Sequence, residues 1–418
     1  MLRLLADLYI QVKRQKDKWL YNGCVNLLRS IRYESLASGN TIRTPAKVTS
    51  SAGYEFLCSY NWVGSQEPRI YVPGSPRELD LKQEELPFTV PVDAGQSFID
   101  QNAYKSRKHQ FEPLFLALDI MKPDFKFNDV DLVADRTSLR RLMKFAAGKL
   151  GDIFRVDLRV VQNTLFMNRR ERKSLTWASN NKSHHSYGFG FEAAVTRPLP
   201  GLEDSSSHHR IIQYQMGGLK CVVRYEVDVQ LNDDNGKIET EVNYTPHSSD
   251  SLKNAPSEDN NGQRQGDFRD RIQVIQRGKH NPSAKIAEIK SQPLGKSSRR
   301  FLAYTPQLWF GRTPNLIYGE HKNGNFETVR VADFTEKLIR WETENQQALQ
   351  KLTLLVTQLR YIASTNRWGC IAVHSTENPG VLNLYRPSRE IQPISAKFIP
   401  VQWDGFKYVP RNINSKDT

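Results

Sequence analysis

Two short patterns in the sequence have the composition of a metal-binding site. Glu226 and Asp228 are separated by one valine, and Glu288 and Lys290 are separated by one isoleucine. Because side chains alternate between the two faces of a β-strand, each pair would project from a single face. Hard cations such as Mg²⁺ and Mn²⁺ prefer oxygen ligands, and a nearby ammonium can stabilise a phosphate or orient the attacking water. If the strands pair, three carboxylates and a lysine converge, which predicts metal-dependent phosphodiester hydrolysis. An ordinary solvated strand face would show the same alternation.

The elements that must position these residues read as a sheet with flanking helices. Alternating apolar runs predict strands within residues 54–76, 130–133, 154–167, 211–229, 284–290 and 315–318. Met216-Gly217-Gly218 predicts a hairpin inside the fourth of these runs. Helical spacing of apolar residues predicts helices over residues 111–120 and about 333–363. The expected fold is α/β (α+β), with a mixed twisted sheet, flanking helices and a catalytic cleft between sheets.

Two segments differ from this core in composition. Residues 1 to about 31 combine helically spaced leucines with lysines and arginines, so residues 1–50 are predicted to be a basic N-terminal helix or extension. The stretch from about 232 to 283 is rich in Asn, Asp, Ser, Gln and Gly, so it is predicted to be a disordered insertion. Residues 51–418 are otherwise expected to form one catalytic domain.

The bulk properties favour a polyanionic partner. The formal net charge is +14 and the pI is about 9.5, and lysine and arginine gain affinity for nucleic acid by displacing counterions from phosphates. The four cysteines form no Cys-x-x-Cys pair, which argues against a zinc ribbon or a disulfide framework. Without a long apolar run or a secretory signal, we expect a soluble intracellular protein without membrane contact, in the nucleus, the cytoplasm or both.

The order of the acidic motifs resembles that of the PD-(D/E)XK nuclease superfamily, and further segments resemble its DXO family of RNA 5′-end decapping nucleases. Residues 131–139 (DLVADRTSL) are similar to the family's first motif, a strand that ends in an arginine reaching the RNA backbone, which corresponds to Arg136. Residues 187–192 (YGFGFE) are similar to the second motif, whose glutamate is a metal ligand and corresponds to Glu192.

The remaining motifs follow in the family's order. Glu226-Val227-Asp228 resembles the third motif, and Glu288-Ile289-Lys290 the fourth, in which the carbonyl of the middle residue faces a metal. Residues 307–319 (QLWFGRTPNLIYG) resemble the fifth, and Gln307 matches a glutamine near the metals. The resemblance implies two divalent cations, Mg²⁺ or Mn²⁺. It implies as their ligands Glu192, Glu226, Asp228, Glu288 and the Ile289 carbonyl. It implies that Lys290 assists electrostatically and that Arg136, Gln307 and Lys290 contact RNA.

The sequence departs from the family pattern in three places. The family's Gly-Leu-Leu after the first-motif arginine is Thr137-Ser138-Leu139 here, and its Gly-Phe-Arg after the last strand is Gly319-Glu320-His321. An arginine that would help to hold phosphate is therefore missing. The segment between the third and fourth motifs is also longer than the family usually carries.

The resemblance implies a metal-dependent hydrolase of RNA 5′ ends, with decapping, pyrophosphohydrolase or 5′–3′ exoribonuclease activity. Its substrate would be RNA with a 5′ phosphate, a triphosphate or a non-standard cap, and a 5′–3′ exoribonuclease is a candidate protein partner. The alternatives are a non-catalytic RNA-binding paralogue that partners an exoribonuclease, and a DNA nuclease of the same superfamily.

Other polar clusters carry weaker signals. Adjacent histidines at His184-His185 and His208-His209 lack the spacing of zinc ligands, and we expect them in surface loops. The basic run at 169–173 fits a nuclear targeting signal, an RNA-contacting loop or a solvated hairpin tip.

Overall fold

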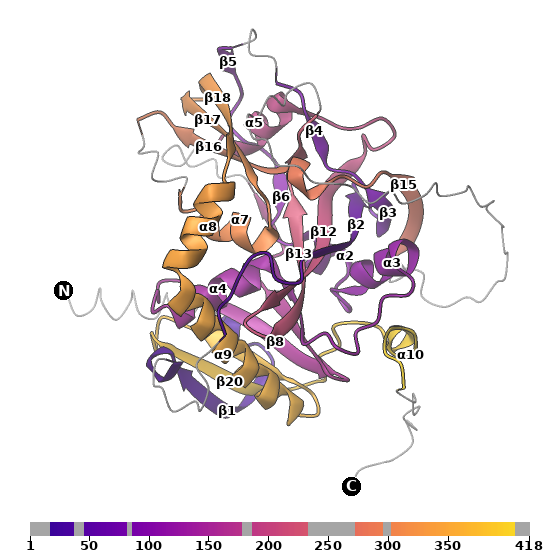
Figure 1. The fold of residues 1–418 in the computed structure, drawn as a ribbon, viewed down its shortest axis with the longest axis vertical. Coiled ribbons are helices and arrows are strands. Elements are labelled where there is room, and N and C mark those ends of the chain that lie inside the picture. The colour runs from indigo at the N-terminus through magenta and orange to yellow at the C-terminus, as the bar shows by residue number, and fades with distance from the viewer. Residues whose placement is uncertain are drawn as a thin grey trace, which may run out of the picture.

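The computed structural model of the chain describes residues 17–36, 46–81, 86–177, 186–232, 272–295 and 302–405. Most strands in these ranges belong to an eleven-stranded sheet, here the large sheet, or a seven-stranded sheet, here the small sheet (Figure 1). The large sheet has the order β1-β20-β19-β8-β9-β7-β13-β12-β2-β3-β15, and the small sheet has the order β11-β4-β14-β16-β17-β18-β5. Helices flank the mixed large sheet, so the predicted α/β class is confirmed.

The bounds of the elements are as follows. The strands of the large sheet are β1 (Cys24–Arg32), β2 (Glu55–Val63), β3 (Arg69–Gly74), β7 (Leu132–Asp135), β8 (Phe154–Val161), β9 (Thr164–Arg170), β12 (Ser205–Met216), β13 (Leu219–Val227), β15 (Gln273–Gly278), β19 (Cys370–His374) and β20 (Val381–Pro387). Those of the small sheet are β4 (Arg77–Leu79), β5 (Phe88–Thr89), β11 (Thr196–Arg197), β14 (Val229–Gln230), β16 (Ile286–Pro293), β17 (Asn315–Lys322) and β18 (Asn325–Asp333), while β6 (Gln96–Phe98) pairs with β10 (Leu175–Trp177). The α-helices are α2 (Gln101–Lys105), α3 (Glu112–Met121), α4 (Arg136–Ala146), α5 (Gly188–Val195), α7 (Thr305–Gly311), α8 (Thr335–Glu344), α9 (Gln346–Ser364) and α10 (Ile399–Gln402), and the 3₁₀ helices are η1 (Lys18–Tyr21), η2 (Tyr33–Leu36), η5 (Ser283–Lys285) and η6 (Ala396–Phe398).

Apolar side chains cover both faces of the large sheet. On one face, α4 and α9 pack on β8, β13 and β19, and Leu352, Leu355 and Leu359 of α9 are fully buried there (Figure 1). On the other face, α3 packs Phe115 against Trp403 near the end of the described chain. None of the helices in the described ranges is long and apolar enough to cross a membrane.

The chain passes from the large sheet to the small sheet at Asp228. The predicted hairpin is present, because β12 and β13 are antiparallel and are joined by Gly217 and Gly218, whose φ angles of 57° and 94° favour glycine. After β13, the chain leaves the large sheet at Asp228 and continues as β14, which pairs with β16 at Val229 and Ala287. The two acidic patterns therefore lie at the seam between the sheets.

The prediction of an N-terminal helix is wrong over Cys24–Arg32. These residues form β1, which pairs antiparallel with β20 at the edge of the large sheet. Pairing with a strand from the far end of the sequence overrides the local helical spacing, an effect that the local pattern does not reveal. Residues 1–16, which carry most of the basic helical pattern, lie outside the described residues.

The predicted insertion at 232–283 is wrong at its C-terminal end. Gln273–Gly278 forms β15, which pairs parallel with β3, and Ser283 begins the 3₁₀ helix η5. The strand contains only two large apolar residues, Val274 and Ile275, and the surrounding polar residues mask them in a compositional window. Residues 233–271 lie outside the described residues.

The long helix predicted over 333–363 is two helices. Asn345 ends α8 and begins α9, with φ of −107° and ψ of 15°, and its amide donates to the Trp341 carbonyl at 2.8 Å. The backbone amide of Asn345 also donates to the Trp341 carbonyl, at 2.9 Å, so the side chain adds a second hydrogen bond to the carbonyl at the end of α8.

Phe191 anchors α5, the helix that carries Glu192, to the small sheet. Its buried ring stacks on Phe326, with the ring centroids 4.4 Å apart. Gly319 in β17 provides the space for the Phe191 ring, since a Cβ at this position would lie 2.5 Å from the ring.

We expect Phe191→Ala to lower the free energy of unfolding by about 3–5 kcal/mol, because it removes a buried ring and leaves a cavity. Phe189→Ala on the same helix is the matched control, since Phe189 is 57% exposed and its loss should change stability by no more than about 0.5 kcal/mol. Urea unfolding measures both, and equal effects would contradict the anchoring role of Phe191.

Candidate active site

The centre of the candidate site is an ammonium that donates to three oxygen atoms. Lys290 Nζ lies 3.0 Å from Glu288 Oε2, 3.3 Å from Asp228 Oδ2 and 2.8 Å from the Ile289 carbonyl oxygen. The Ile289 amide also donates to Asp228 Oδ2 at 2.8 Å, which ties the seam to β16. The structure therefore brings together Asp228, Glu288, Ile289 and Lys290, as the sequence predicts.

Glu288 is the most enclosed carboxylate of this group. Its side chain is 2% exposed and receives hydrogen bonds from Arg136 Nη1, from Lys290 and from Gln307 Nε2, the last at 2.5 Å. Burial alone would raise the pKa of Glu288, but the charges and hydrogen bonds of Arg136 and Lys290 outweigh it and lower the pKa to about 2. Burial alone would lower the pKa of Lys290, but the Asp228 and Glu288 carboxylates outweigh it and raise the pKa. Lys290 therefore remains an ammonium at neutral pH.

Arg136 and Gln307 reach Glu288 from two different helices. Arg136 begins α4 directly after β7, is 7% exposed and places its guanidinium 5.2 Å from the centre of the Tyr225 ring. Gln307 lies in α7 and accepts a hydrogen bond from Arg140 Nη1 at 2.9 Å. Arg136 is thus occupied by a carboxylate, and its role in contacting RNA stays a prediction.

Asp228 and the two remaining predicted carboxylates border a recess of about 80 Å³ between the sheets. Glu192, Glu226 and Asp228 line it, together with Arg77 of the small sheet and His208 of the large sheet. A volume of this size accommodates several water molecules but not a nucleotide.

Carboxylates at the recess outnumber the cations that compensate them. Burial, Asp228 and Glu226 raise the pKa of Glu192 to about 8. The surrounding protein, Asp228 and Glu288 raise the pKa of Glu226 to about 7, although solvent reaches its side chain within the recess. Each of these groups is less stable as an anion than it would be in water, so the recess favours an added positive charge.

The donor set fits a hard divalent cation in its chemistry, since it consists of carboxylates and a carbonyl with an excess of negative charge. The geometry differs from an assembled metal site. Among the described residues, no group of three or more His, Cys, Asp or Glu side chains is arranged to hold an ion. Lys290 and Arg136 instead occupy the Asp228 and Glu288 oxygens.

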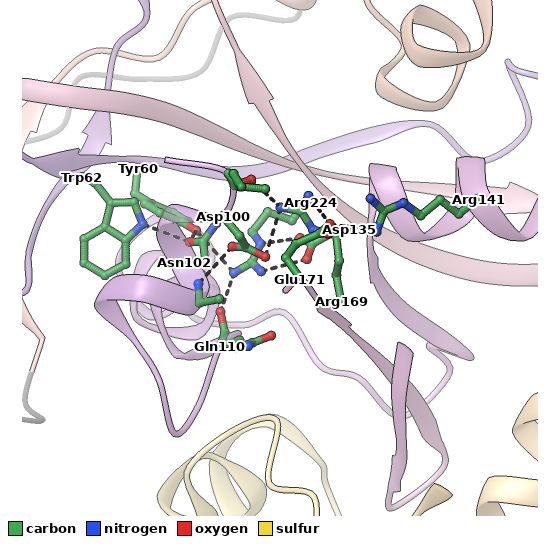
Figure 2. Close-up of polar contacts among 12 residues, drawn as sticks. Tyr60, Trp62, Asp100, Asn102, Gln110, Asp135, Arg141, Arg169, Glu171 and Arg224 are labelled. Carbon is green, nitrogen blue, oxygen red and sulfur yellow. Dashed lines mark hydrogen bonds and ion pairs between the residues drawn. The ribbon is translucent and has the colours of Figure 1, made fainter. Parts of the chain in front are cut away.

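A buried network that the sequence analysis missed supports the site from the large sheet. Arg224 forms a double hydrogen bond to Asp135, with Nε–Oδ1 and Nη2–Oδ2 distances of 2.7 and 3.2 Å, across paired strands β13 and β7 (Figure 2). Asp135 directly precedes Arg136, and Arg224 lies two residues before Glu226 on the same strand. The alternation of side chains in residues 224–228 was therefore a signal that Arg224 shares a face with Glu226.

The network continues to both sides of this pair. Tyr60 Oη and Trp62 Nε1 both donate to Asn102 Oδ1, at 2.6 and 3.0 Å, and Arg224 Nη1 lies 3.5 Å from Tyr60 Oη (Figure 2). On the other side, Arg169 pairs with Asp100 at 3.0 Å. Part of the basic run at 169–173 is therefore structural, because Arg169 is held inside the protein.

The expectation that the paired histidines lie in surface loops is wrong for His208 and His209. Both are buried in β12, where His208 contacts Asn61 and His209 contacts Ser207. A strand in the middle of the large sheet accepts them because one ring nitrogen of each has a polar partner. Burial lowers the pKa of both, so they stay neutral. His184 and His185 lie outside the described residues.

We expect Arg224→Met to lower the free energy of unfolding by about 3–5 kcal/mol, because it leaves the Asp135 carboxylate enclosed without its partner. Lys220→Met on the same strand is the control, since Lys220 and Asp129 form an exposed ion pair whose loss should cost no more than about 1 kcal/mol. Urea unfolding of the two variants distinguishes them, and a loss for Arg224→Met as small as that of the control would contradict the supporting role.

Comparisons with solved structures identify the fold. The chain is similar to Candida albicans Rai1 in complex with pU5 and Mn²⁺, with a TM-score of 0.55, 12% identity and coverage of 90% of this chain and 98% of that one. It is also similar to Scheffersomyces stipitis Rai1, with a TM-score of 0.53, 12% identity and coverage of 90% and 98%. At this identity the likeness establishes the fold, and it confirms the resemblance to DXO-type nucleases at that level.

Sequence comparisons give a family without an assigned activity. No curated protein matches the chain. A family model described as "Domain of unknown function (DUF8563)" matches residues 35–403. This range contains both sheets except β1, and it contains every residue of the candidate site. The chain therefore belongs to the DUF8563 family.

Proposed function

We propose that this protein is a divalent-cation-dependent hydrolase that acts on the 5′ end of RNA. The observation that carries the proposal is that Asp228, Glu288 and the Ile289 carbonyl converge around the Lys290 ammonium at the seam between the sheets. The fold supports it, since Candida albicans Rai1, which has the same fold, was solved with pU5 and Mn²⁺. The motif resemblance adds the 5′ end as the point of attack.

In this proposal, the acidic residues of the seam bind metal ions and Lys290 stabilises the phosphate. The cations, Mg²⁺ or Mn²⁺, would be held by Glu192, Glu226, Asp228, Glu288 and the Ile289 carbonyl. They would supply an activated water and neutralise the leaving oxygen. Lys290 carries a fixed positive charge and can stabilise the negative charge that develops on phosphorus-bound oxygens. It cannot act as a general base, because its neighbours raise its pKa. Gln307 fixes one face of Glu288 through its amide.

The geometry also favours a second candidate function, RNA binding without catalysis. Lys290 and Arg136 already compensate Glu288, so this carboxylate is satisfied without a metal ion. A binding protein has no use, however, for Glu192 and Glu226, whose charges repel phosphate and whose pKa values are raised. Hydrolysis therefore accounts for more of the site than binding alone does.

Incubation of the purified protein with Mn²⁺ and a panel of substrates tests the proposal. We expect cleavage of linear 5′-triphosphate RNA or RNA with a non-standard cap, and we expect circular RNA and DNA to resist. Asp228→Asn and Glu192→Gln should each lower the rate at least about a hundredfold, because both remove a charge from the proposed ligand set. RNA affinity should stay nearly unchanged, since lysines and arginines dominate it.

Asp333→Asn serves as the control, since Asp333 is an exposed carboxylate at the end of β18 and is not part of the recess. Full activity in Asp228→Asn would overturn the assigned ligand set. Binding of RNA without cleavage of any substrate would favour the non-catalytic function. Rapid cleavage of circular RNA would indicate an endonuclease.

The stability of the metal-free protein should fall as the pH rises from 5 to 8. Glu192 and Glu226 have pKa values of about 8 and 7 in the folded state, above the value of roughly 4.3 for a free glutamate. The folded state therefore holds protons that the unfolded state has lost in this range. Glu288 acts in the opposite direction, but its contribution changes only below about pH 4.5, as the pH falls towards its pKa of about 2.

Mn²⁺ should reverse this trend, because it competes with the same protons. Thermal unfolding with and without Mn²⁺ at pH 6 and pH 8 measures the effect, and the rise in Tm should be larger at pH 8. In Glu192→Gln the pH dependence of the metal-free protein should be weaker. A Tm increase that does not depend on pH would place the metal at carboxylates other than these.

A further inference from the structure

We propose that a groove on the large sheet is a second binding site, which holds the backbone of single-stranded RNA. The groove has a volume of about 1020 Å³, which exceeds the roughly 300–1,000 Å³ of small-molecule pockets. Its floor comes from β8, β9, β19 and β20, and its walls come from the segments around Trp19, Arg107 and Arg389. No residue of the small sheet lines it, so it is distinct from the recess at the seam.

The acidic side chains in the groove are all neutralised by arginines. Asp157 on the floor is 2% exposed and pairs with Arg155 and Arg170, at 2.8 and 2.7 Å. Glu171 pairs with Arg141 and Arg169, and Glu390 pairs with Arg159. Arg141, Arg169 and Arg159 do not line the groove. They neutralise the Glu171 and Glu390 carboxylates from outside it and leave the cations of the lining free of these acids.

Four exposed cations remain without a carboxylate partner among the described residues. They are Arg107, Lys108, Arg172 and Arg389. They come from three separate segments of the chain, and the fold gathers them around one concave surface. Concentrated positive charge along a groove is the arrangement that tracks a nucleic-acid backbone, and the half-buried Trp19 on the same surface offers a ring on which a base can stack.

The lining argues against an acidic protein surface as the occupant. The centre of a protein–protein interface is apolar and depleted of charge. None of the large apolar side chains that are exposed in the described ranges lines the groove. A strand of phosphates matches the charged floor and walls better than a protein surface does.

Helix α4 connects the groove to the candidate active site. Arg136 at its start contacts Glu288, Arg140 contacts Gln307, and Arg141 pairs with Glu171 at 2.8 Å. Figure 2 shows Arg141 extending from the helix towards Glu171 and Arg169. Five residues of an α-helix span about 7.5 Å along its axis, so one short helix contacts both Glu288 at the seam and Glu171 at the groove. The proposal rests on the proposed function only for the choice of RNA as the polyanion.

The test measures RNA affinity without catalysis. Arg107, Lys108, Arg172 and Arg389 are replaced together by glutamate in the full chain, and binding of a labelled single-stranded RNA is followed by fluorescence anisotropy in EDTA. The control replaces four exposed cations elsewhere, Lys322, Arg330, Lys337 and Arg340, which changes the net charge equally. We expect the groove variant to bind at least about tenfold more weakly than the control. Its slope of log affinity against log salt should be shallower by about 3, at roughly 0.7 for each lost phosphate contact of a single strand.

Three outcomes would overturn the proposal. One is an equal loss of affinity in the two variants, which would reflect net charge alone. Another is unchanged binding in the groove variant, provided that its circular dichroism shows it folded. The third is binding of a polyglutamate peptide to the wild-type protein as tightly as RNA, with the same loss in the groove variant, which would assign the groove to an acidic protein. A groove variant that binds weakly, alongside a wild-type protein that cleaves nothing, would uphold the groove and refute the proposed hydrolase.

Discussion

The structure around the candidate site depends on the compensation of one buried carboxylate. Glu288 is almost fully enclosed, and a bare carboxylate there would cost several kcal/mol. Its three donors come from the start of α4, from its own strand β16 and from α7. Because α4 packs on the large sheet and β16 belongs to the small sheet, satisfying Glu288 also fixes the two sheets against each other. The buried pair of Arg224 and Asp135 extends this constraint, since it holds the strand end from which Arg136 emerges.

The same region contains charge that the protein leaves uncompensated. Glu192 and Glu226 face the recess with raised pKa values, while the neighbouring Glu288 has a lowered one. These carboxylates thus behave oppositely, because among the three only Glu288 forms ion pairs with an arginine and a lysine. A fold selected for stability alone would pair or remove the others. Such local destabilisation is typical of functional sites.

The sequence predicted which residues come together at the candidate site better than it predicted the elements around them. The pairs Glu226/Asp228 and Glu288/Lys290 were identifiable because alternation along a strand is a local property, and the structure places them together. The switch of sheets at Asp228 was not identifiable, since the residues of β14 continue the apolar alternation of β13. Strand β1 was missed because its partner, β20, lies about 350 residues away in the sequence. The orientation of Arg136 was also out of reach, since nothing in residues 131–139 indicates that its guanidinium turns towards Glu288.

The distribution of charge has a consequence for how RNA could be held. The net charge of +14 describes the whole chain, yet the recess itself is acidic and repels phosphates unless a cation is present. In the proposed function, affinity for RNA must therefore come from surfaces outside the recess. One such surface is the groove, whose four cations have no carboxylate partner among the described residues. Binding energy from a remote part of the substrate can then offset the cost of bringing a phosphate to the carboxylates. If the proposed function holds, a basic groove that is separate from an acidic recess would let the protein bind RNA without a metal ion, whereas cleavage would require one.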